Sequence, residues 1–247
     1  MNKQQTGRTG LVTGGSRGIG AAIVRRLAAD GAQVAFTYAA SKDRAEELAA
    51  QVTAAGGQAL AIEADNADPK AVQAAVARTV AEFGGLDILV NNAGAAVMLP
   101  VADLPLAAFD RMIAVNVRGA FTAVQAAVPH LGDGGRIIMI GSVNAHRAPY
   151  PGLSGYSASK AAVAGLTRAL ARELGPRGIT VNNIQAGPTD TDMNPADGRF
   201  ADMLHRIMPL GRHAEPADIA SAVAYLASPE ASFVTGTNWD VDGGFAV

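Results

Sequence analysis

The chain has 247 residues, of which 49% are apolar and 17% charged, and its formal net charge is −2. This composition is typical of a folded globular protein and argues against a disordered chain. Without a dense run of Lys or Arg, it also argues against nucleic-acid binding. The absence of cysteine excludes disulfides and thiolate chemistry, and the four histidines are scattered, so we expect no metal site.

Short apolar runs alternate along the chain with longer stretches of helical periodicity. Strands are predicted at residues 10–13, 33–38, 59–64, 88–91, 136–142, 180–185 and 238–241, and helices at 18–29, 42–55, 69–83, 106–130, 156–174 and 216–227. The alternation predicts an α/β fold: a doubly wound, mainly seven-stranded parallel sheet with helices on both faces, as in Rossmann-like proteins. We expect residues 1–247 to form a single dinucleotide-binding catalytic domain.

Two further segments bear on this organisation. Residues 189–210 are rich in turn-forming and capping residues, which predicts a long loop, with a short helix near 200–208, that acts as a substrate lid. The polar first ten residues do not resemble a signal peptide, and no apolar run is long enough to span a bilayer. A cytoplasmic protein without membrane contact is therefore expected.

A glycine-rich turn links the first predicted strand to the first predicted helix. Gly14, Gly18 and Gly20 follow the spacing Gly-x-x-x-Gly-x-Gly, with Ser16 and Ile19 inside the turn. Such a turn lets the backbone approach a pyrophosphate, and the helix N-terminus offers it free N–H groups and the positive end of the helix dipole. An ordinary strand-to-helix connection is the alternative, but the position after the first strand favours dinucleotide binding.

The end of the second predicted strand bears on the choice of cofactor. An acidic residue there would bind an unphosphorylated ribose, but Tyr38 occupies the position. Arg17, Ser41 and Lys42 lie nearby and suit a 2′-phosphate. This pattern favours NADP(H) over NAD(H). The alternative is that Arg17 is only solvated and that backbone groups hold the 2′-hydroxyl.

Tyr156 and Lys160 are four residues apart, so they share one face of the predicted helix. A free tyrosine has a pKa of about 10, and a nearby ammonium would lower it towards neutral pH. Ser142 ends a predicted strand, where the carboxyl ends of parallel strands face a ligand crevice. Asn116 lies inside a predicted helix, where asparagine is a mediocre helix former. Together these residues indicate a catalytic site.

These motifs, in this order, resemble the short-chain dehydrogenase/reductase family over essentially the whole chain. The matching segments are Thr13-Gly14-x-x-x-Gly18-Ile19-Gly20, Asp65, Asn91-Asn92-Ala93-Gly94, Asn116, Ser142, Tyr156-x-x-x-Lys160 and Asp242-Gly243-Gly244. The chain is similar to the 3-oxoacyl-acyl-carrier-protein reductases and to bacterial carbonyl reductases within that family. The resemblance also implies a homotetramer.

The resemblance implies a role for each catalytic residue. Tyr156 would protonate the carbonyl oxygen as hydride arrives at carbon, and Ser142 would orient that oxygen. Lys160 would lower the pKa of Tyr156 and hold the nicotinamide ribose, and Asn116 would anchor a water that relays protons to Lys160. Asp65 would bind the adenine amine. The other implied cofactor residues are Asn66, Asn91, which would meet the adenosine-side ribose, Ala93, Gly94, Gly187, Pro188, Thr189 and Thr191.

The substrate is expected to meet the loop 143–155 and the lid. His146, Tyr150, Leu153 and Met193 are candidate lining residues, although each one fits simple loop packing equally well. No basic cluster suits an acyl carrier, which favours a small or medium, partly apolar ketone. Two alternatives stay open: a 3-oxoacyl-acyl-carrier-protein reductase, and a non-catalytic nucleotide-binding sensor. The second is kept because some biofilm-dispersal proteins that bind a cyclic dinucleotide look similar to this chain.

Overall fold

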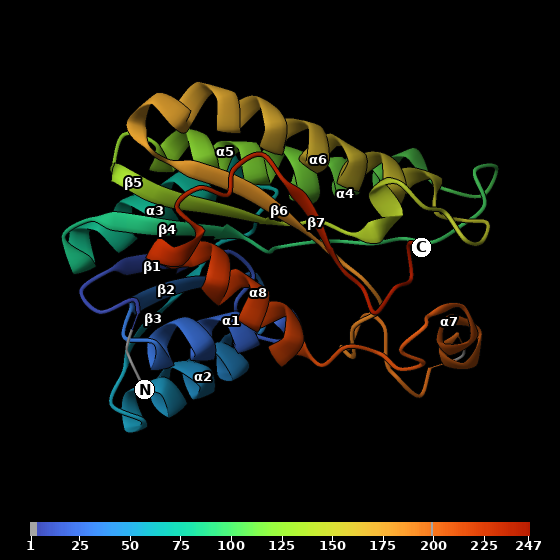
Figure 1. The fold of residues 1–247 in the computed structure, drawn as a ribbon, viewed down its shortest axis with the longest axis horizontal. Helices are drawn as coiled ribbons and strands as arrows, with labels where there is room; N and C mark the ends of the chain where they lie inside the picture. The colour runs from blue at the N-terminus through green and yellow to red at the C-terminus, as the bar shows by residue number, and fades with distance from the viewer. Residues whose placement is uncertain (1–3, 199) are drawn as a thin grey trace.

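The computed structural model describes residues 4–198 and 200–247. In this part of the chain, seven parallel strands form one sheet in the order β3-β2-β1-β4-β5-β6-β7 (Figure 1). The strands are β1 (Thr9–Val12), β2 (Gln33–Tyr38), β3 (Gln58–Glu63), β4 (Leu86–Asn91), β5 (Leu131–Ile140), β6 (Thr180–Ala186) and β7 (Asn238–Val241). The order reverses beside β1, which confirms the predicted doubly wound sheet and places a crevice at the carboxyl ends of β1 and β4.

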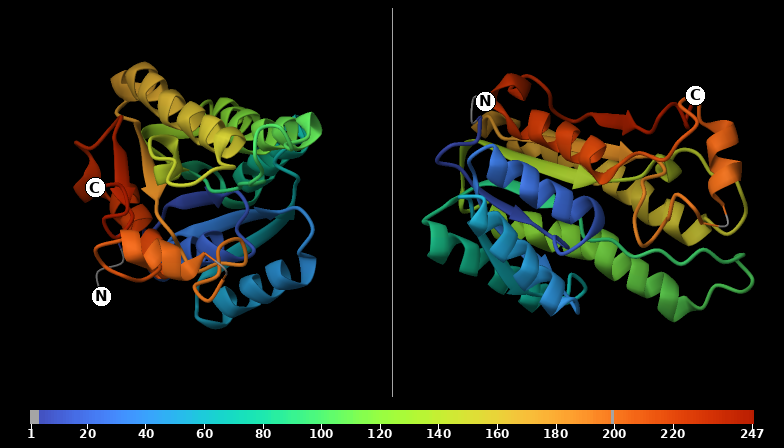
Figure 2. Two further views of the ribbon diagram at one scale, coloured as in Figure 1. Left: turned by 90° about the vertical axis from the view of Figure 1, so that its right-hand side faces the viewer. Right: turned by 90° about the horizontal axis from the view of Figure 1, so that it is seen from below.

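Helices cover both faces of the sheet (Figures 1 and 2). One face carries α1 (Gly18–Ala29), α2 (Lys42–Ala54) and α8 (Pro216–Ala227), and the other carries α3 (Pro69–Phe83), α4 (Leu106–Ile113), α5 (Gly119–Ala127) and α6 (Ser154–Leu174). No helix within the described ranges is both long and apolar enough to cross a membrane.

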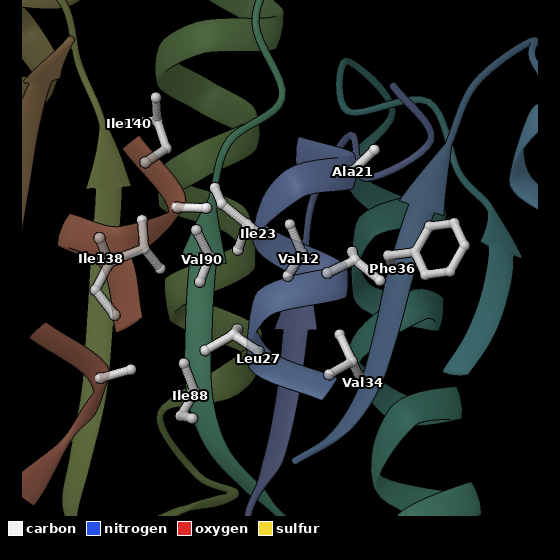
Figure 3. Packing of buried hydrophobic residues seen from close by; sticks show 14 of the residues in the cluster. Val12, Ala21, Ile23, Leu27, Val34, Phe36, Ile88, Val90, Ile138 and Ile140 are labelled. Carbon is white, nitrogen blue, oxygen red and sulfur yellow. The ribbon is translucent and has the colours of Figure 1, made fainter. Parts of the chain in front are cut away.

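The two layers have separate apolar cores because successive side chains of a strand point to opposite faces. In β1, Val12 packs with the cluster under α1, whereas Leu11 packs with the cluster under α5 and α6. Figure 3 shows the α1 side, where Ile23 and Leu27 of the helix meet the strand residues. The strand residues labelled there are Val12, Val34, Phe36, Ile88, Val90, Ile138 and Ile140. Both faces of the central strands are thus buried, as their apolar runs predict.

The predicted helix 106–130 ends at Ala127 and is not α-helical throughout. Between α4 and α5 the structure has the π-helical turn η1 (Ala114–Arg118), in which the Gly119 N–H reaches back to the Ala114 carbonyl. Single π turns inside α-helices are frequent at functional sites. Asn116 lies within this turn.

Strand β5 also differs from its prediction, since it begins at Leu131 and not at 136. The segment Gly132-Asp133-Gly134-Gly135 has the composition of a turn. It nevertheless lies within the strand as an irregularity, because Leu131 pairs with Leu86 and the register shifts before the pair Arg136 and Ile88.

The predicted lid crosses the carboxyl ends of the strands and carries α7 (Ala201–Ile207), which lies apart from both helical layers (Figure 1). Its first part is anchored by a parallel bridge between Thr189 and Ala214. On α7, His205 Nε2 lies 2.8 Å from His213 Nδ1, and His213 is buried. The lid is therefore tied to the body of the protein at both ends.

Candidate active site

The carboxyl ends of the strands open into a cavity of about 830 Å³ that extends under the lid. Most of the residues predicted to contact the cofactor line its wall. These are Gly14, Ser16, Arg17, Gly18, Ile19, Gly20, Tyr38, Ser41, Asp65, Asn66, Ala93, Gly94, Tyr156, Lys160, Gly187, Pro188, Thr189 and Thr191. The described residues contain no group of three His, Cys, Asp or Glu side chains that could hold a metal ion.

Two of the predicted cofactor residues point elsewhere. Lys42 Nζ lies 3.7 Å from Glu46 Oε1 on the exposed surface of α2. The Asn91 side chain is buried against β5 and α5, with its amide directed to a backbone carbonyl and a methionine sulfur. Asn92 lines the cavity in place of Asn91, and its amide donates to the carbonyl of Gly14 over 2.9 Å. Periodicity could not separate these two asparagines because the strand ends between them.

The glycine-rich turn leaves no room for a side chain at Gly14 or Gly20. Gly14 has φ +66°, and a Cβ there would lie 2.9 Å from the Cα of Ala93. A Cβ on Gly20 would lie 2.3 Å from the carbonyl oxygen of Gly14. At the start of α1, Arg17 makes no side-chain capping bond with the described residues, so the first N–H groups of the helix are open to an anion. The turn therefore fits a pyrophosphate.

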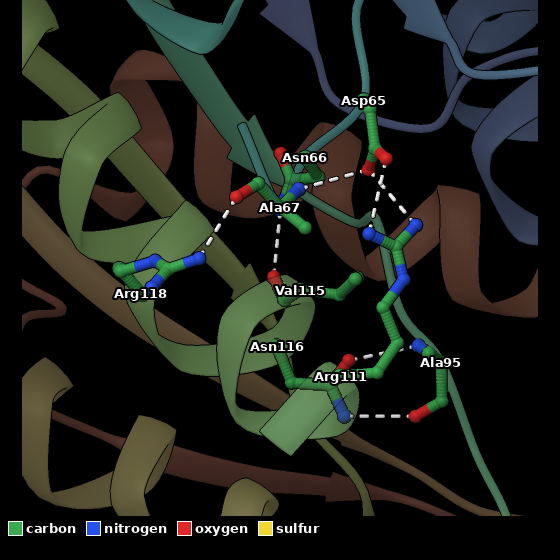
Figure 4. Close-up of polar contacts among 8 residues, drawn as sticks. All are labelled: Asp65, Asn66, Ala67, Ala95, Arg111, Val115, Asn116 and Arg118. Carbon is green, nitrogen blue, oxygen red and sulfur yellow. Dashed lines mark hydrogen bonds and ion pairs between the residues drawn. The ribbon is translucent and has the colours of Figure 1, made fainter. Parts of the chain in front are cut away.

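At the other wall of the cavity, Asp65 forms a two-pronged ion pair with Arg111 of α4 (Figure 4). Both N–O distances are 3.0 Å, and Asp65 Oδ1 also accepts from the Ala67 N–H. The Arg111 hydrogen bonds hold the pKa of the Asp65 carboxyl below its usual range. Arg111 was not predicted as a site residue, because a charge on an amphipathic helix gives no sign of its partner.

The same wall is joined to the π-helical turn η1. Asn66 Nδ2 donates to the carbonyl of Val115 over 2.7 Å, and Arg118 Nη2 donates to the carbonyl of Ala67 over 3.0 Å (Figure 4). Val115 itself lines the cavity, whereas its neighbour Asn116 is buried behind it. The turn after β3 and the π turn thus form one hydrogen-bonded unit.

The Asn116 side chain faces away from this unit, towards α6. Its Nδ2 donates to the Ala95 carbonyl and to Ser159 Oγ, both over 2.9 Å, and its Oδ1 accepts from the Ala95 N–H over 2.8 Å. Ser159 lies on α6 between Tyr156 and Lys160. Asn116 therefore holds α6 against the loop after β4, and both ends of its carboxamide are engaged with the protein.

Ser142 and Tyr156 meet at the inner end of the cavity. The backbone N–H of Ser142 donates a 2.9 Å hydrogen bond to Oε1 of Gln185 on β6, which fixes the Ser142 backbone. The Ser142 side chain hydrogen-bonds Tyr156 and lowers the pKa of its phenol, but burial outweighs this effect and raises that pKa to about 12. Tyr156 is thus held in its protonated form at neutral pH.

Lys160 is 5% exposed and donates from Nζ to the Ile140 carbonyl over 2.8 Å. Its ammonium lies 5.8 Å from the centre of the Tyr156 ring. Burial lowers the pKa of Lys160 to about 8. The sequence predicts a Tyr156 pKa lowered by Lys160, but the structure shows the opposite net direction, because desolvation of the phenol dominates and Lys160 is bonded to a carbonyl of β5.

Apolar side chains form the outer part of the cavity. Tyr150 stacks on Phe200 with ring centres 5.7 Å apart and planes 12° apart. The Tyr150 hydroxyl lies 3.9 Å from the sulfur of Met98, and Met193 and Phe245 complete this wall. Burial raises the pKa of Tyr150. Of the predicted substrate residues, Tyr150 and Met193 line the cavity.

The other two predicted substrate residues are absent from the described wall. His146 Nε2 lies 3.5 Å from Asp240 Oδ2, and Leu153 is buried where α6 begins. Both residues hold the loop after β5 in place. The structure favours the packing interpretation for each of them.

Near the glycine-rich turn, two arginines meet one carboxylate of the lid. Asp192 Oδ2 accepts from Arg17 Nη1 over 3.2 Å and from Arg44 Nη1 over 2.8 Å. These bonds lower the pKa of Asp192, with the largest effect from Arg44. Arg44 lies in the first turn of α2, close in sequence to the predicted Ser41 and Lys42. The sequence signal that points to it is its basic side chain in the segment just after β2.

Comparison with known proteins places this arrangement in a family. A family described as "Enoyl-(Acyl carrier protein) reductase" matches residues 14–246. A solved short-chain dehydrogenase/reductase of Serratia marcescens is 56% identical to this chain and superposes on it with a TM-score of 0.97. The match covers 99% of this chain and 100% of the Serratia chain. The chain belongs to the short-chain dehydrogenase/reductase family. It is thus an NAD(P)-dependent oxidoreductase, as its motifs predict.

Other members of the family bear on cofactor and activity. A short-chain dehydrogenase of Burkholderia cenocepacia in complex with NADP is 52% identical, with a TM-score of 0.97 and coverage of 99% and 100%. A cyclic-di-GMP-binding biofilm dispersal mediator protein of Escherichia coli is 49% identical, covering 97% of this chain and 98% of its own. A 3-oxoacyl-acyl-carrier-protein reductase of Staphylococcus aureus is 41% identical, with 96% and 97% covered.

Proposed function

We propose that this short-chain dehydrogenase/reductase reduces a ketone, or oxidises the corresponding secondary alcohol, with NADP(H) and with Tyr156 as general acid and base. The observation that carries the proposal is the pairing of Tyr156 with Ser142 at the inner end of the cavity, one helical turn from Lys160. A phenol whose pKa lies at about 12 is protonated at neutral pH and can donate a proton, and the positive charges of Lys160 and of a bound oxidised nicotinamide would lower that pKa towards the range that acid–base catalysis needs.

When bound, the nicotinamide cofactor supplies the hydride. In reduction, Ser142 orients the carbonyl oxygen and Tyr156 donates its phenolic proton to it. Lys160 is charged below a pH of about 8, and its ammonium holds the ribose hydroxyls and returns a proton towards Tyr156. Asn116 fixes α6 so that these side chains keep their spacing, and its part in a water relay stays a prediction.

The walls of the cavity divide the binding of the cofactor between them. The N–H groups at the start of α1 hold the pyrophosphate, and Asp65 holds the adenine. Arg17 and Arg44 hold the 2′-phosphate, since guanidinium groups pair well with phosphate oxygens. Tyr38, with no negative charge, does not repel that phosphate. The NADP in the related Burkholderia enzyme supports the same choice.

The substrate we propose is a small or medium, partly apolar carbonyl compound. The stacked rings of Tyr150 and Phe200, with Met98 and Met193, offer apolar surface and hydroxyl or thioether groups but no charge. An acyl thioester on a carrier protein is the alternative, as in the Staphylococcus reductase. In either case residues 189–210 act as the lid over the substrate, within a single catalytic domain.

Turnover tests the proposal directly. Oxidation of NADPH, followed by absorbance, is measured with a panel of ketones and acyl thioesters. Tyr156→Phe should lower kcat at least 100-fold without weakening NADPH binding. Tyr225→Phe, on α8 and away from the cavity wall, is the matched control that should retain turnover. Turnover confined to acyl thioesters would reject the small ketone, and Tyr156→Phe with full activity would reject the mechanism.

A second candidate function is a nucleotide sensor, favoured by the 49% identity to the cyclic-di-GMP-binding protein. The intact set of Ser142, Tyr156 and Lys160 argues for catalysis. Calorimetric titration with cyclic di-GMP separates the two functions. A sensor should bind it equally well with Tyr156 or Phe at this position and should turn over none of the carbonyl compounds.

We also propose that the protein assembles as a homotetramer. Large apolar side chains are exposed on two separate surfaces: Val101, Leu106 and Phe121 near α4 and α5, and Phe233 and Trp239 near β7. Exposed apolar patches are typical of subunit interfaces. Light scattering coupled to gel filtration should give four times the chain mass of 25.1 kDa, and a monomer would contradict the proposal.

A further inference from the structure

The Asp192 carboxylate fastens the lid to the glycine-rich turn and to α2. Arg17 and Arg44 come from different elements, the turn before α1 and the first turn of α2, and both donate to the same oxygen, Oδ2. Two guanidinium groups on one carboxylate leave one positive charge uncompensated. The pair is therefore still attractive to a further anion beside the glycine-rich turn, where Arg17 lines the cavity.

The fastening includes the backbone of the lid. Thr191 and Asn194 pair with each other across a tight turn, and Asp192 lies in that turn. Thr191 rests on the glycine-rich turn, since a Cβ on Gly18 would lie 3.2 Å from its methyl group. Residues 191–194 are called the lid turn here. Displacement of the Asp192 side chain removes its two hydrogen bonds to Arg17 and Arg44, which help to hold the lid turn beside the glycine-rich turn.

We infer that Asp192 competes with the 2′-phosphate of NADP(H) for Arg17 and Arg44, so that binding of the phosphate unfastens the lid turn, whereas NAD(H) leaves it fastened. The inference rests on the NADP(H) use proposed above. Asp192 thereby takes part in cofactor discrimination, because the two arginines bind either its carboxylate or the 2′-phosphate.

Charge decides the direction of the exchange. A phosphate monoester carries about −1.5 to −2 charges at neutral pH and three acceptor oxygens, against one charge and a single bonded oxygen for Asp192. A phosphate on the same guanidinium groups also repels the carboxylate. Asp192 is 57% exposed on its side chain, so water receives it readily when it leaves.

The competition makes a measurable difference to affinity. Each exposed ion pair contributes little, so removing the charge of Asp192 should tighten binding of a 2′-phosphate by about three- to tenfold. Adenosine 2′,5′-bisphosphate and 5′-AMP are suitable probes because they lack the nicotinamide and differ only in the 2′-phosphate. Calorimetric titration measures both against the wild type and Asp192→Asn.

Asp197→Asn is the matched control, since it removes one negative charge from the same exposed segment without touching either arginine. We expect Asp192→Asn to tighten the bisphosphate while 5′-AMP binds within twofold of the wild type, and Asp197→Asn to change neither. Weaker bisphosphate binding in Asp192→Asn would show that Asp192 orients the arginines, and unchanged binding would show that it does not compete. Either result overturns the inference.

Hydrogen–deuterium exchange of the lid turn supplies a second measurement. The amides of residues 191–194 should exchange faster in wild-type protein with the bisphosphate than with 5′-AMP, and equally fast with both probes in Asp192→Asn. Faster exchange with neither probe overturns the inference. Equal affinity of the wild type for both probes would instead refute the proposed preference for NADP(H), which keeps the two failures distinct.

Discussion

Lys160 should make the free energy of unfolding depend on pH, and comparison with a variant that lacks its amine should isolate that dependence. The substitution is Lys160→Met, which keeps an unbranched side chain only one atom shorter and removes the charge. Burial lowers the pKa of Lys160 from 10.5 to about 8. In the folded protein the charged form is therefore disfavoured relative to the unfolded chain.

The sign follows from proton counting. Below a pH of about 8 the folded and unfolded states both carry the proton, so the destabilisation from Lys160 is fully present and constant. Between pH 8 and 10.5 the unfolded chain binds more protons than the folded one, so the free energy of unfolding rises with pH. Integrated from pH 7.5 to 9.5, this gain amounts to about 2 kcal/mol.

Urea unfolding at pH 7.5, 8.5 and 9.5 measures the gain as the difference between wild type and Lys160→Met. The variant leaves the Ile140 carbonyl without the hydrogen bond from Lys160. That loss does not depend on pH, so it lowers the unfolding free energy of the variant by the same amount at each pH. Tyr156 stays protonated throughout this range because its pKa is about 12. Parallel curves for the two proteins would refute a depressed pKa for Lys160.

Four further substitutions test the packing, the proposed adenine contact of Asp65 and the proposed substrate wall. Gly119→Ala should destabilise the protein by about 1–3 kcal/mol in urea unfolding, because its Cβ would lie 2.2 Å from the Asn66 carbonyl oxygen. Gly165→Ala, whose Cβ would meet no described atom within 4 Å, should stabilise it by about 0.5–1 kcal/mol, and equal effects would refute this reading of the close contact. Asp65→Asn should weaken NADPH binding about tenfold by titration but shift stability by less than about 1 kcal/mol, since the ion pair is exposed. Phe200→Ala should lower kcat/KM for aryl ketones about three- to tenfold relative to small aliphatic ketones, and an unchanged ratio would place the substrate elsewhere.

Much of the fold was predictable because burial and periodicity are local properties of the sequence. The central strands are apolar on both faces, and α1, α3 and α8 have ends that match their predicted bounds. The π turn was not predictable, since its extra residue depends on contacts made far away in the sequence, between Asn116 and Ala95 and Ser159. The glycine-rich start of β5 was missed because its strand conformation is imposed by pairing with β4.

The site follows the same division. Side chains at the carboxyl ends of strands or in the glycine-rich turn could be found from topology, as Ser142 and Gly18 were. Arg111 and Gln185 could not, because each acts through a partner from another element. The direction of the Tyr156 pKa was also beyond the sequence, since it depends on how deeply the fold buries the phenol.

The contacts of the π turn also bear on how such an enzyme can diverge. The turn after β3 and helix α6 are both held by this one five-residue segment. On the function proposed above, substitutions there should therefore change nucleotide affinity and proton transfer together. The arginines beside Asp192 are exposed and joined to no such segment. On the NADP(H) use proposed above, we therefore expect cofactor preference to change by a few surface substitutions with little loss of stability, while the turn after β3 stays constrained by its bonds to η1.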